Sequence, residues 1–146
     1  MKTIAKVSSD SQFLGTGWSF PPVFNKSSDA MSVVMVSHEQ DINESLSILL
    51  GTSPGERVMY PAYGCGLKKT IFENFDESSA TALKDTITRA VLFFEPRITL
   101  DNIKVDIRDV HQGCIRFCLD YTVRSTNNRS NIVYPFYFEE GTNVRF

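Results

Sequence analysis

The sequence has no long apolar stretch, which excludes a membrane-spanning helix. Its longest apolar runs, such as those at 33–36 and 91–94, are only a few residues long, whereas a helix that crosses a bilayer needs roughly 20 apolar residues. Lys2 and Lys6 near the N-terminus are not followed by an apolar segment of about 7 to 15 residues, so no secretory signal is predicted. We therefore expect no membrane insertion, and folding and assembly in the cytoplasm.

Positive charge is not in excess, and this argues against a nucleic-acid partner. The chain of 146 residues has 15 Lys and Arg residues against 17 Asp and Glu residues, a formal net charge of -2. Surfaces that follow a phosphate backbone need clustered Lys and Arg side chains. The longest basic run here is the pair Lys68-Lys69, so we expect no nucleic-acid partner.

Metal-ligating side chains are scarce, with three cysteines and two histidines. Cys114 and Cys118 lie four residues apart in a predicted strand, about 13 Å at the usual rise. That separation is too long for a disulfide or for one zinc ion held at about 2.3 Å from each sulfur, even with His111 nearby. We predict that the cysteines pack in the core, and that the chain has no metal site and no cofactor.

No catalytic set can be selected from the sequence. Glu73, Glu95 and Asp101 are available as acids, but nothing places two of them across a sugar cleft, as a glycosidase requires. The glycines around Cys65 lack the third glycine of a dinucleotide fingerprint, and no βαβ unit surrounds them. We interpret 61–66 as a tight turn within a hairpin, and predict that the protein is not an enzyme.

Apolar periodicity predicts two helices. The first begins at Ser37, which forms a capping-box pattern with Gln40, and it ends near Gly51. The second spans 79–94 and ends before Pro96, which cannot continue it. The apolar stripes of the two helices consist of Ile42, Leu46, Leu49 and Leu50, and of Leu83, Ile87, Ala90, Val91 and Phe94.

In the C-terminal third the period changes to two, which predicts three strands joined by polar turns at 109–113 and 125–131. The predicted strands are 103–107, 115–123 and 132–138. An antiparallel meander with one solvated face follows from this pattern. Pro135 lies inside the third strand and cannot donate to a ladder, so that strand is expected at an edge of the sheet.

The N-terminal half contributes less regular structure. Residues 1–30 combine glycine, proline and serine with isolated aromatics, which predicts an extended arm pinned onto the domain or onto a neighbour. Two short strands are predicted at 57–60 and 67–72. The expected fold is α+β: two main helices packed on a C-terminal three-stranded antiparallel sheet, with a short hairpin and the arm, and with 31–146 as one domain.

Two features suggest interactions with other chains. Glu95 places a carboxylate at the negative end of the second helix and therefore needs a positive partner. Glu95 and Arg97, on either side of Pro96, either pair with each other or reach another protein. The aromatic edge segment 132–138 is either covered by the arm or accepts a strand from a partner.

Several segments together resemble the baseplate wedge and sheath-initiator family of contractile tails. This family includes a lysozyme-like wedge protein of contractile phages, TssE of type VI secretion, and counterparts in extracellular contractile injection particles. The segments that carry the resemblance are FLGTGWSFPP (13–22), DINESLSILL (41–50), PGERVM (54–59), YGCGL (63–67), EPR (95–97) and NIVYPFY (131–137).

The resemblance implies a structural protein that templates sheath assembly by sharing strands with the first sheath ring. It implies that the corner of Glu95, Pro96 and Arg97 docks on the helical core bundle of the wedge. It also implies a hetero-oligomer with wedge and sheath proteins, six copies per baseplate, in a phage tail, a type VI apparatus or an extracellular particle. The residues expected to serve strand exchange are Ile132, Tyr134, Phe136, Tyr137 and Phe138. The alternatives are a peptidoglycan-cleaving lysozyme-like enzyme and a small-ligand-binding domain.

Overall fold

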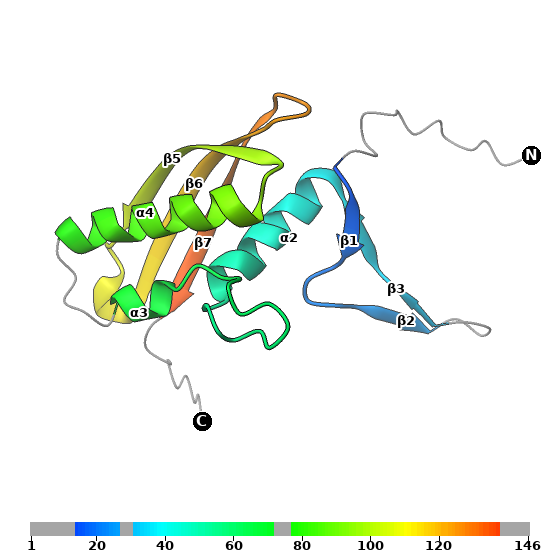
Figure 1. Cartoon of the computed structure of the whole chain (residues 1–146), viewed down its shortest axis with the longest axis horizontal. Helices are drawn as coiled ribbons and strands as arrows, with labels where there is room; N and C mark the ends of the chain where they lie inside the picture. Colours follow the sequence, from blue (N-terminus) through cyan, green and yellow to red (C-terminus); the bar gives the residue numbers. More distant parts are fainter. Residues whose placement is uncertain (1–13, 27–30, 72–76, 138–146) are drawn as a thin grey trace, which may run out of the picture.

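The computed structural model describes residues 14–26, 31–71 and 77–137. In Figure 1, two long helices, α2 (His38–Gly51) and α4 (Glu77–Phe94), lie against a sheet formed by the C-terminal part of the chain. A short helix, α3 (Leu67–Ile71), lies between them in sequence. None of the helices in these described ranges is long and apolar enough to cross a membrane.

The sheet is the predicted antiparallel meander. Its strands are β5 (Ile98–Asp106), β6 (Cys114–Val123) and β7 (Arg129–Tyr137), in that spatial order. The alternate residues of the central strand β6 are completely buried, as the period of two predicted; these are Ile115, Phe117, Leu119, Tyr121 and Val123. Pro135 lies in β7, which pairs only with β6 among the described strands, so its predicted edge position is confirmed.

The two long helices pack on the inner face of the sheet, α4 next to β5 and α2 next to β7. Helix α4 ends at Phe94, just before Pro96, as predicted. Helix α2 begins after Ser37, but the Ser37 side chain makes no capping hydrogen bond, and Gln40 donates instead to Glu44 at 3.1 Å. The predicted start of the helix is therefore correct, whereas the capping box does not form.

The short hairpin predicted at 57–72 is wrong. Residues 57–60 form an irregular exposed turn, and Leu67–Ile71 is helical. The loop is closed by the backbone of Cys65, whose N–H donates to the carbonyl of Thr52 at 2.9 Å. A Cβ at Gly64 would lie 2.5 Å from that same carbonyl, and its φ of +129° favours glycine. Close packing on the end of α2 thus selects a compact loop over a ladder.

The two described strands of the N-terminal arm pair with the chain that follows the arm. Strand β1 (Thr16–Trp18) pairs with β4 (Met35–Ser37), and β2 (Phe24–Lys26) pairs with β3 (Met31–Val33). We call residues 14–26 and 31–37 the N-terminal ribbon. Its ladders join residues on both sides of the predicted boundary at residue 30. In Figure 1 it projects from α2 on the side away from the main sheet.

Candidate functional site

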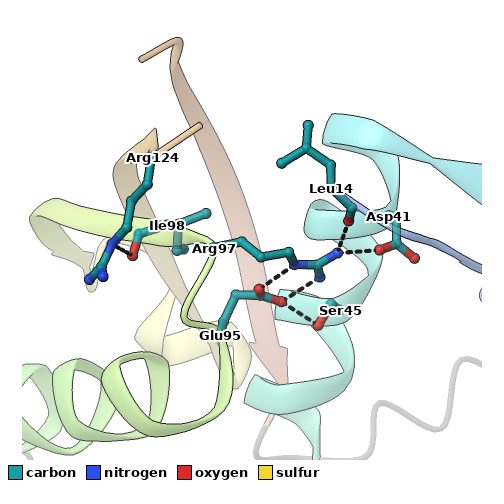
Figure 2. Close-up of polar contacts among 7 residues, drawn as sticks. All are labelled: Leu14, Asp41, Ser45, Glu95, Arg97, Ile98 and Arg124. Atoms are coloured by element: carbon teal, nitrogen blue, oxygen red, sulfur yellow. Dashed lines mark hydrogen bonds and ion pairs between the residues drawn. The ribbon is translucent and has the colours of Figure 1, made fainter. Parts of the chain in front are cut away.

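The corner between α4 and β5 is held by a bidentate ion pair (Figure 2). Arg97 donates from Nε to Oε1 of Glu95 at 2.6 Å, and from its second terminal nitrogen to Oε2 at 2.7 Å. Ser45 of α2 donates its hydroxyl to the same Oε2 at 2.7 Å. Of the two options open from the sequence, this structure therefore has Glu95 paired with Arg97, which provides the positive partner that the helix end requires.

The remaining terminal nitrogen of Arg97 connects the corner to the start of the ribbon. It donates to the carbonyl of Leu14 at 2.7 Å and to Oδ2 of Asp41 at 2.5 Å. Leu14 is itself buried, at 4% exposure. One guanidinium thus joins three parts of the chain: the N-terminal ribbon, helix α2 and the corner that leads into β5.

Burial makes this network internal to the fold. Glu95 is 2% exposed, and it is the one fully buried charged residue among the described positions. The side-chain hydrogen bonding that Arg97 donates to Glu95 raises the pKa of Arg97 and outweighs the opposing effect of desolvation. Arg97 therefore stays charged, and both Glu95 oxygens already accept hydrogen bonds within the chain. Pro96 between the two charged residues is exposed.

A surface hollow lies beside the corner, with a volume of about 330 Å³. It is lined by Leu14, Pro96, Arg97, Arg124 and Ser125. Arg124 is fixed at its rim by a hydrogen bond to the carbonyl of Ile98 at 3.1 Å (Figure 2). The hollow is therefore a preformed feature of the surface, next to the sequence motif that the resemblance assigns to docking.

The predicted strand-exchange residues divide between the two faces of β7. Ile132 and Tyr134 pack against the core and Phe136 is buried, so these three hold the strand on the helices. Tyr137 lies on the opposite face and is 68% exposed. Phe138 lies outside the described residues. The inward set thus fixes the position of β7, and Tyr137 remains accessible.

The outer edge of β7 has no partner strand among the described residues. Its ladder with β6 runs without interruption from Arg129 to Tyr137. The N-terminal ribbon does not pair with it, so the alternative in which the arm covers this edge is not found in the described part of the chain. Among the described strands, β6 is therefore the one that pairs with β7.

Three side chains considered for catalysis, Glu95, Asp101 and Cys65, are engaged or buried in the described part of the chain. Glu95 is held by Arg97, and Asp101 accepts a hydrogen bond from Thr122 at 2.6 Å. Burial raises the pKa of the Cys65 thiol to about 12, which keeps it protonated. Glu73 lies outside the described residues, and within the described ranges no group of three His, Cys, Asp or Glu side chains could hold a metal ion.

Sequence reasoning missed the part of the network that comes from distant residues. No role was predicted for Asp41, for Ser45 or for the carbonyl of Leu14. Ser45 and Glu95 are 50 positions apart, and Leu14 and Arg97 are 83 apart. The sequence signal that includes these positions is the family resemblance, because Leu14 lies in its first segment and Asp41 and Ser45 lie in its second.

Comparison with known proteins identifies the family. The family model described as "Baseplate wedge protein gp25" matches residues 36–128, which is more than half of the chain. The chain belongs to this family. It is similar to baseplate wedge protein gp25 of Enterobacteria phage T4, with 32% identity over 84 residues. That match covers 58% of this chain and 57% of the T4 protein, so it spans little more than half of the relative.

Two solved structures share the fold. One, from Geobacter sulfurreducens and named a tail lysozyme, has 39% identity and a TM-score of 0.69, over 76% of this chain and 100% of the other. The second belongs to the baseplate of the anti-feeding prophage. It has 24% identity and a TM-score of 0.62, over 92% of this chain and 94% of the other. At that identity the second likeness concerns the fold alone.

Proposed function

We propose that this chain is a non-catalytic component of the baseplate of a contractile tail or tail-like particle, and that it starts the sheath by adding sheath strands to β7. Membership of the baseplate wedge protein gp25 family supports the baseplate role. The observation that carries the sheath role is the open outer edge of β7, held rigidly by its inward side chains. An unpaired strand edge recruits further strands unless it is blocked.

Pro135 indicates which backbone groups of β7 face this edge. A proline has no N–H, and its position in an edge strand is tolerated where the nitrogen points away from the ladder. Residues two apart on a strand point the same way. The N–H groups of Val133 and Tyr137 are therefore expected on the open side. Each backbone hydrogen bond contributes only about 0.5 to 1.5 kcal/mol, so the exposed Val133 and Tyr137 side chains would add specificity.

The side that meets the wedge is proposed to be the corner of Glu95, Pro96 and Arg97. Glu95 is buried and would act by holding Arg97, whereas Pro96 and the adjoining hollow would contact the partner. The implied arrangement is a hetero-oligomer of wedge and sheath proteins with six copies per baseplate, assembled in the cytoplasm.

Filling the hollow by Ser125→Trp should reduce the amount of this chain in purified baseplates, because Ser125 lines the hollow and is itself exposed.

The sheath role is tested by a proline at the edge. Tyr137→Pro removes an outward N–H, and Tyr137→Ala is the matched control, because it removes the same side chain but keeps the donor. We expect Tyr137→Pro to stop sheath growth while baseplates form normally, and Tyr137→Ala to have a smaller effect. Electron micrographs of purified particles measure both. Equal loss of baseplates and sheaths in Tyr137→Pro would contradict separate surfaces.

A peptidoglycan-cleaving activity is the second candidate, favoured by the name of the Geobacter sulfurreducens structure. The engaged state of Glu95 and Asp101 weighs against it, because a glycosidase needs one carboxylic acid free to protonate the leaving group. Purified chain incubated with peptidoglycan decides between the two. Release of soluble muropeptides, abolished by replacing a single carboxylate, would establish the enzyme.

A further inference from the structure

The N-terminal ribbon has an apolar face that points away from its own domain. In an antiparallel ladder, paired residues lie on the same face. The pairs Trp18 with Met35 and Phe24 with Val33 share one face with Met31, and the Trp18 and Phe24 rings meet edge to face at 6.4 Å. We call this set the ribbon face: Trp18, Phe24, Met31, Val33 and Met35.

The opposite face of the ribbon is the one that meets the protein. Val36 is buried, and a Cβ at Gly17 would lie 2.4 Å from a carboxylate oxygen of Asp41, so these two positions lie against α2. Farther out, this face has the polar residues Asn25 and Ser32. The ribbon is thus amphipathic. One face contacts α2 near Gly17 and Val36 and is polar farther out, at Asn25 and Ser32, whereas the apolar face is exposed to solvent.

Exposure of the ribbon face is large for so small an element. Trp18 is 62% exposed, Phe24 58%, Met31 76% and Met35 50%. A two-stranded ribbon alone is marginally stable in water. The base of this one is fixed, since Leu14 binds Arg97 and the N–H of Phe20 donates to Glu44 at 2.8 Å. The face is therefore held in position rather than left to collapse onto the domain.

The composition of the ribbon face is that of a protein interface. Aromatic residues and Met are enriched at the cores of interfaces, and charged residues are depleted there. Lys26, at the outer end, is the one charged side chain among the described residues of the ribbon. A partner surface that fits would be apolar and uncharged at its centre, with an acidic residue opposite Lys26.

The area of the ribbon face argues against a second copy as the occupant. Its four exposed side chains present roughly 500 Å², whereas a stable two-protein interface buries about 800 Å² per partner. This face alone would therefore give only a weak dimer. Within an assembly of many subunits it suffices as one part of a composite contact. The match to the family model spans residues 36–128, so the five residues of the ribbon face lie outside the matched part of the chain.

We propose that the ribbon face docks on a different protein of the same baseplate, through a contact surface that is apolar at its centre and has an acidic residue opposite Lys26, which pairs with Met31 on this face. This inference rests on the proposed function only in taking the baseplate as the place of assembly. It is independent of the β7 edge and of the corner at Pro96. Trp18, a strong candidate for an energetic hot spot, is the single tryptophan of the chain.

Site-specific photo-crosslinking tests the proposal in assembled particles. Para-benzoylphenylalanine is placed at position 31, on the ribbon face, or at position 32, on the opposite face, in the full chain. We expect position 31 to crosslink to another baseplate protein, identified by mass spectrometry, with at least about tenfold higher yield than position 32. Crosslinks to a second copy or to residues 1–13 of the same chain, equal yields at both positions, or no crosslink would overturn the proposal.

Two further measurements separate the possible failures. Trp18→Ser/Phe24→Ser should lower the amount of this chain in particles about tenfold or more while its melting temperature is unchanged, and Asn25→Ser/Ser32→Ala should have no effect. In the free full chain, acrylamide should quench Trp18 fluorescence; a shielded Trp18 would mean that the chain covers its own face. Absence of the wild-type chain from all particles would refute the proposed function as well, whereas its presence without a face-specific crosslink refutes this inference alone.

Discussion

The Glu95–Arg97 corner and the outer edge of β7 use their hydrogen-bonding groups in opposite ways. At the corner, Ser45 and Arg97 satisfy both oxygens of Glu95 within the chain. At the β7 edge, no described strand pairs with the backbone. The two charged residues of a sequence motif can therefore be used within the fold, whereas backbone groups of a less distinctive segment have no partner strand among the described residues.

The largest expected effect lies at the corner. Glu95→Ala leaves Arg97 partly buried with one of its two carboxylates missing, so we expect the free energy of unfolding to fall by about 3 kcal/mol. Urea unfolding of the purified chain measures this. Asp106→Ala is the control, because it removes a carboxylate from the exposed Asp106–Arg108 pair and should leave stability unchanged.

Such a fall in stability would mean that Glu95→Ala does not act on assembly alone. Glu95 is 2% exposed, so a loss of assembly in that variant has two possible sources. Unchanged stability in Glu95→Ala would contradict the internal role described here and would favour direct docking by Glu95.

A smaller effect is expected at the second contact of the same carboxylate. Ser45→Ala removes the hydroxyl that donates to Glu95 but keeps the ion pair with Arg97. We expect a loss of about 1.5 kcal/mol, the lower end of the range for a hydrogen bond to a charged group, because Glu95 keeps its ion pair with Arg97. A thermal or urea unfolding curve is sufficient. A loss as large as that of Glu95→Ala would mean that the network fails as a unit.

The edge should be the least sensitive to side-chain loss in the free protein. Val133 is 55% exposed on the outer face of β7, and Val133→Ala should change stability by less than about 0.5 kcal/mol. The same unfolding measurement applies. A loss comparable to that of Ser45→Ala would show that the outer face is covered in the free chain, and the contrast between corner and edge would be lost.

Periodicity predicted the main body well, because its elements are long and have one buried face. The burial of alternate residues in β6 and the end of α4 before Pro96 followed directly from spacing. Short segments were less predictable. The short segment that starts at Leu67 is compatible with either strand or helix, and packing beside α4 selects the helix.

The N-terminal ribbon and the corner network depend on contacts that leave no local signal. The glycines and prolines of the ribbon interrupt the alternating pattern by which a strand is predicted. Strands β1 and β2 form because they pair with β4 and β3, which follow residue 30. At the corner, the sequence indicates that Glu95 needs a positive partner, and Arg97 supplies it. It cannot indicate that Asp41 and the Leu14 carbonyl also bind Arg97, because those contacts are set by tertiary packing.

Hydrogen exchange at the β7 edge tests the central claim most directly. In the free chain, the amides of Val133 and Tyr137 should exchange fast, and those of Ile132 and Tyr134, expected to face β6, should exchange slowly. In sheathed particles, the Val133 and Tyr137 amides should become protected about a hundredfold or more. Fast exchange of these two amides in sheathed particles, or full protection already in the free chain, would contradict the claim that β7 accepts a sheath strand.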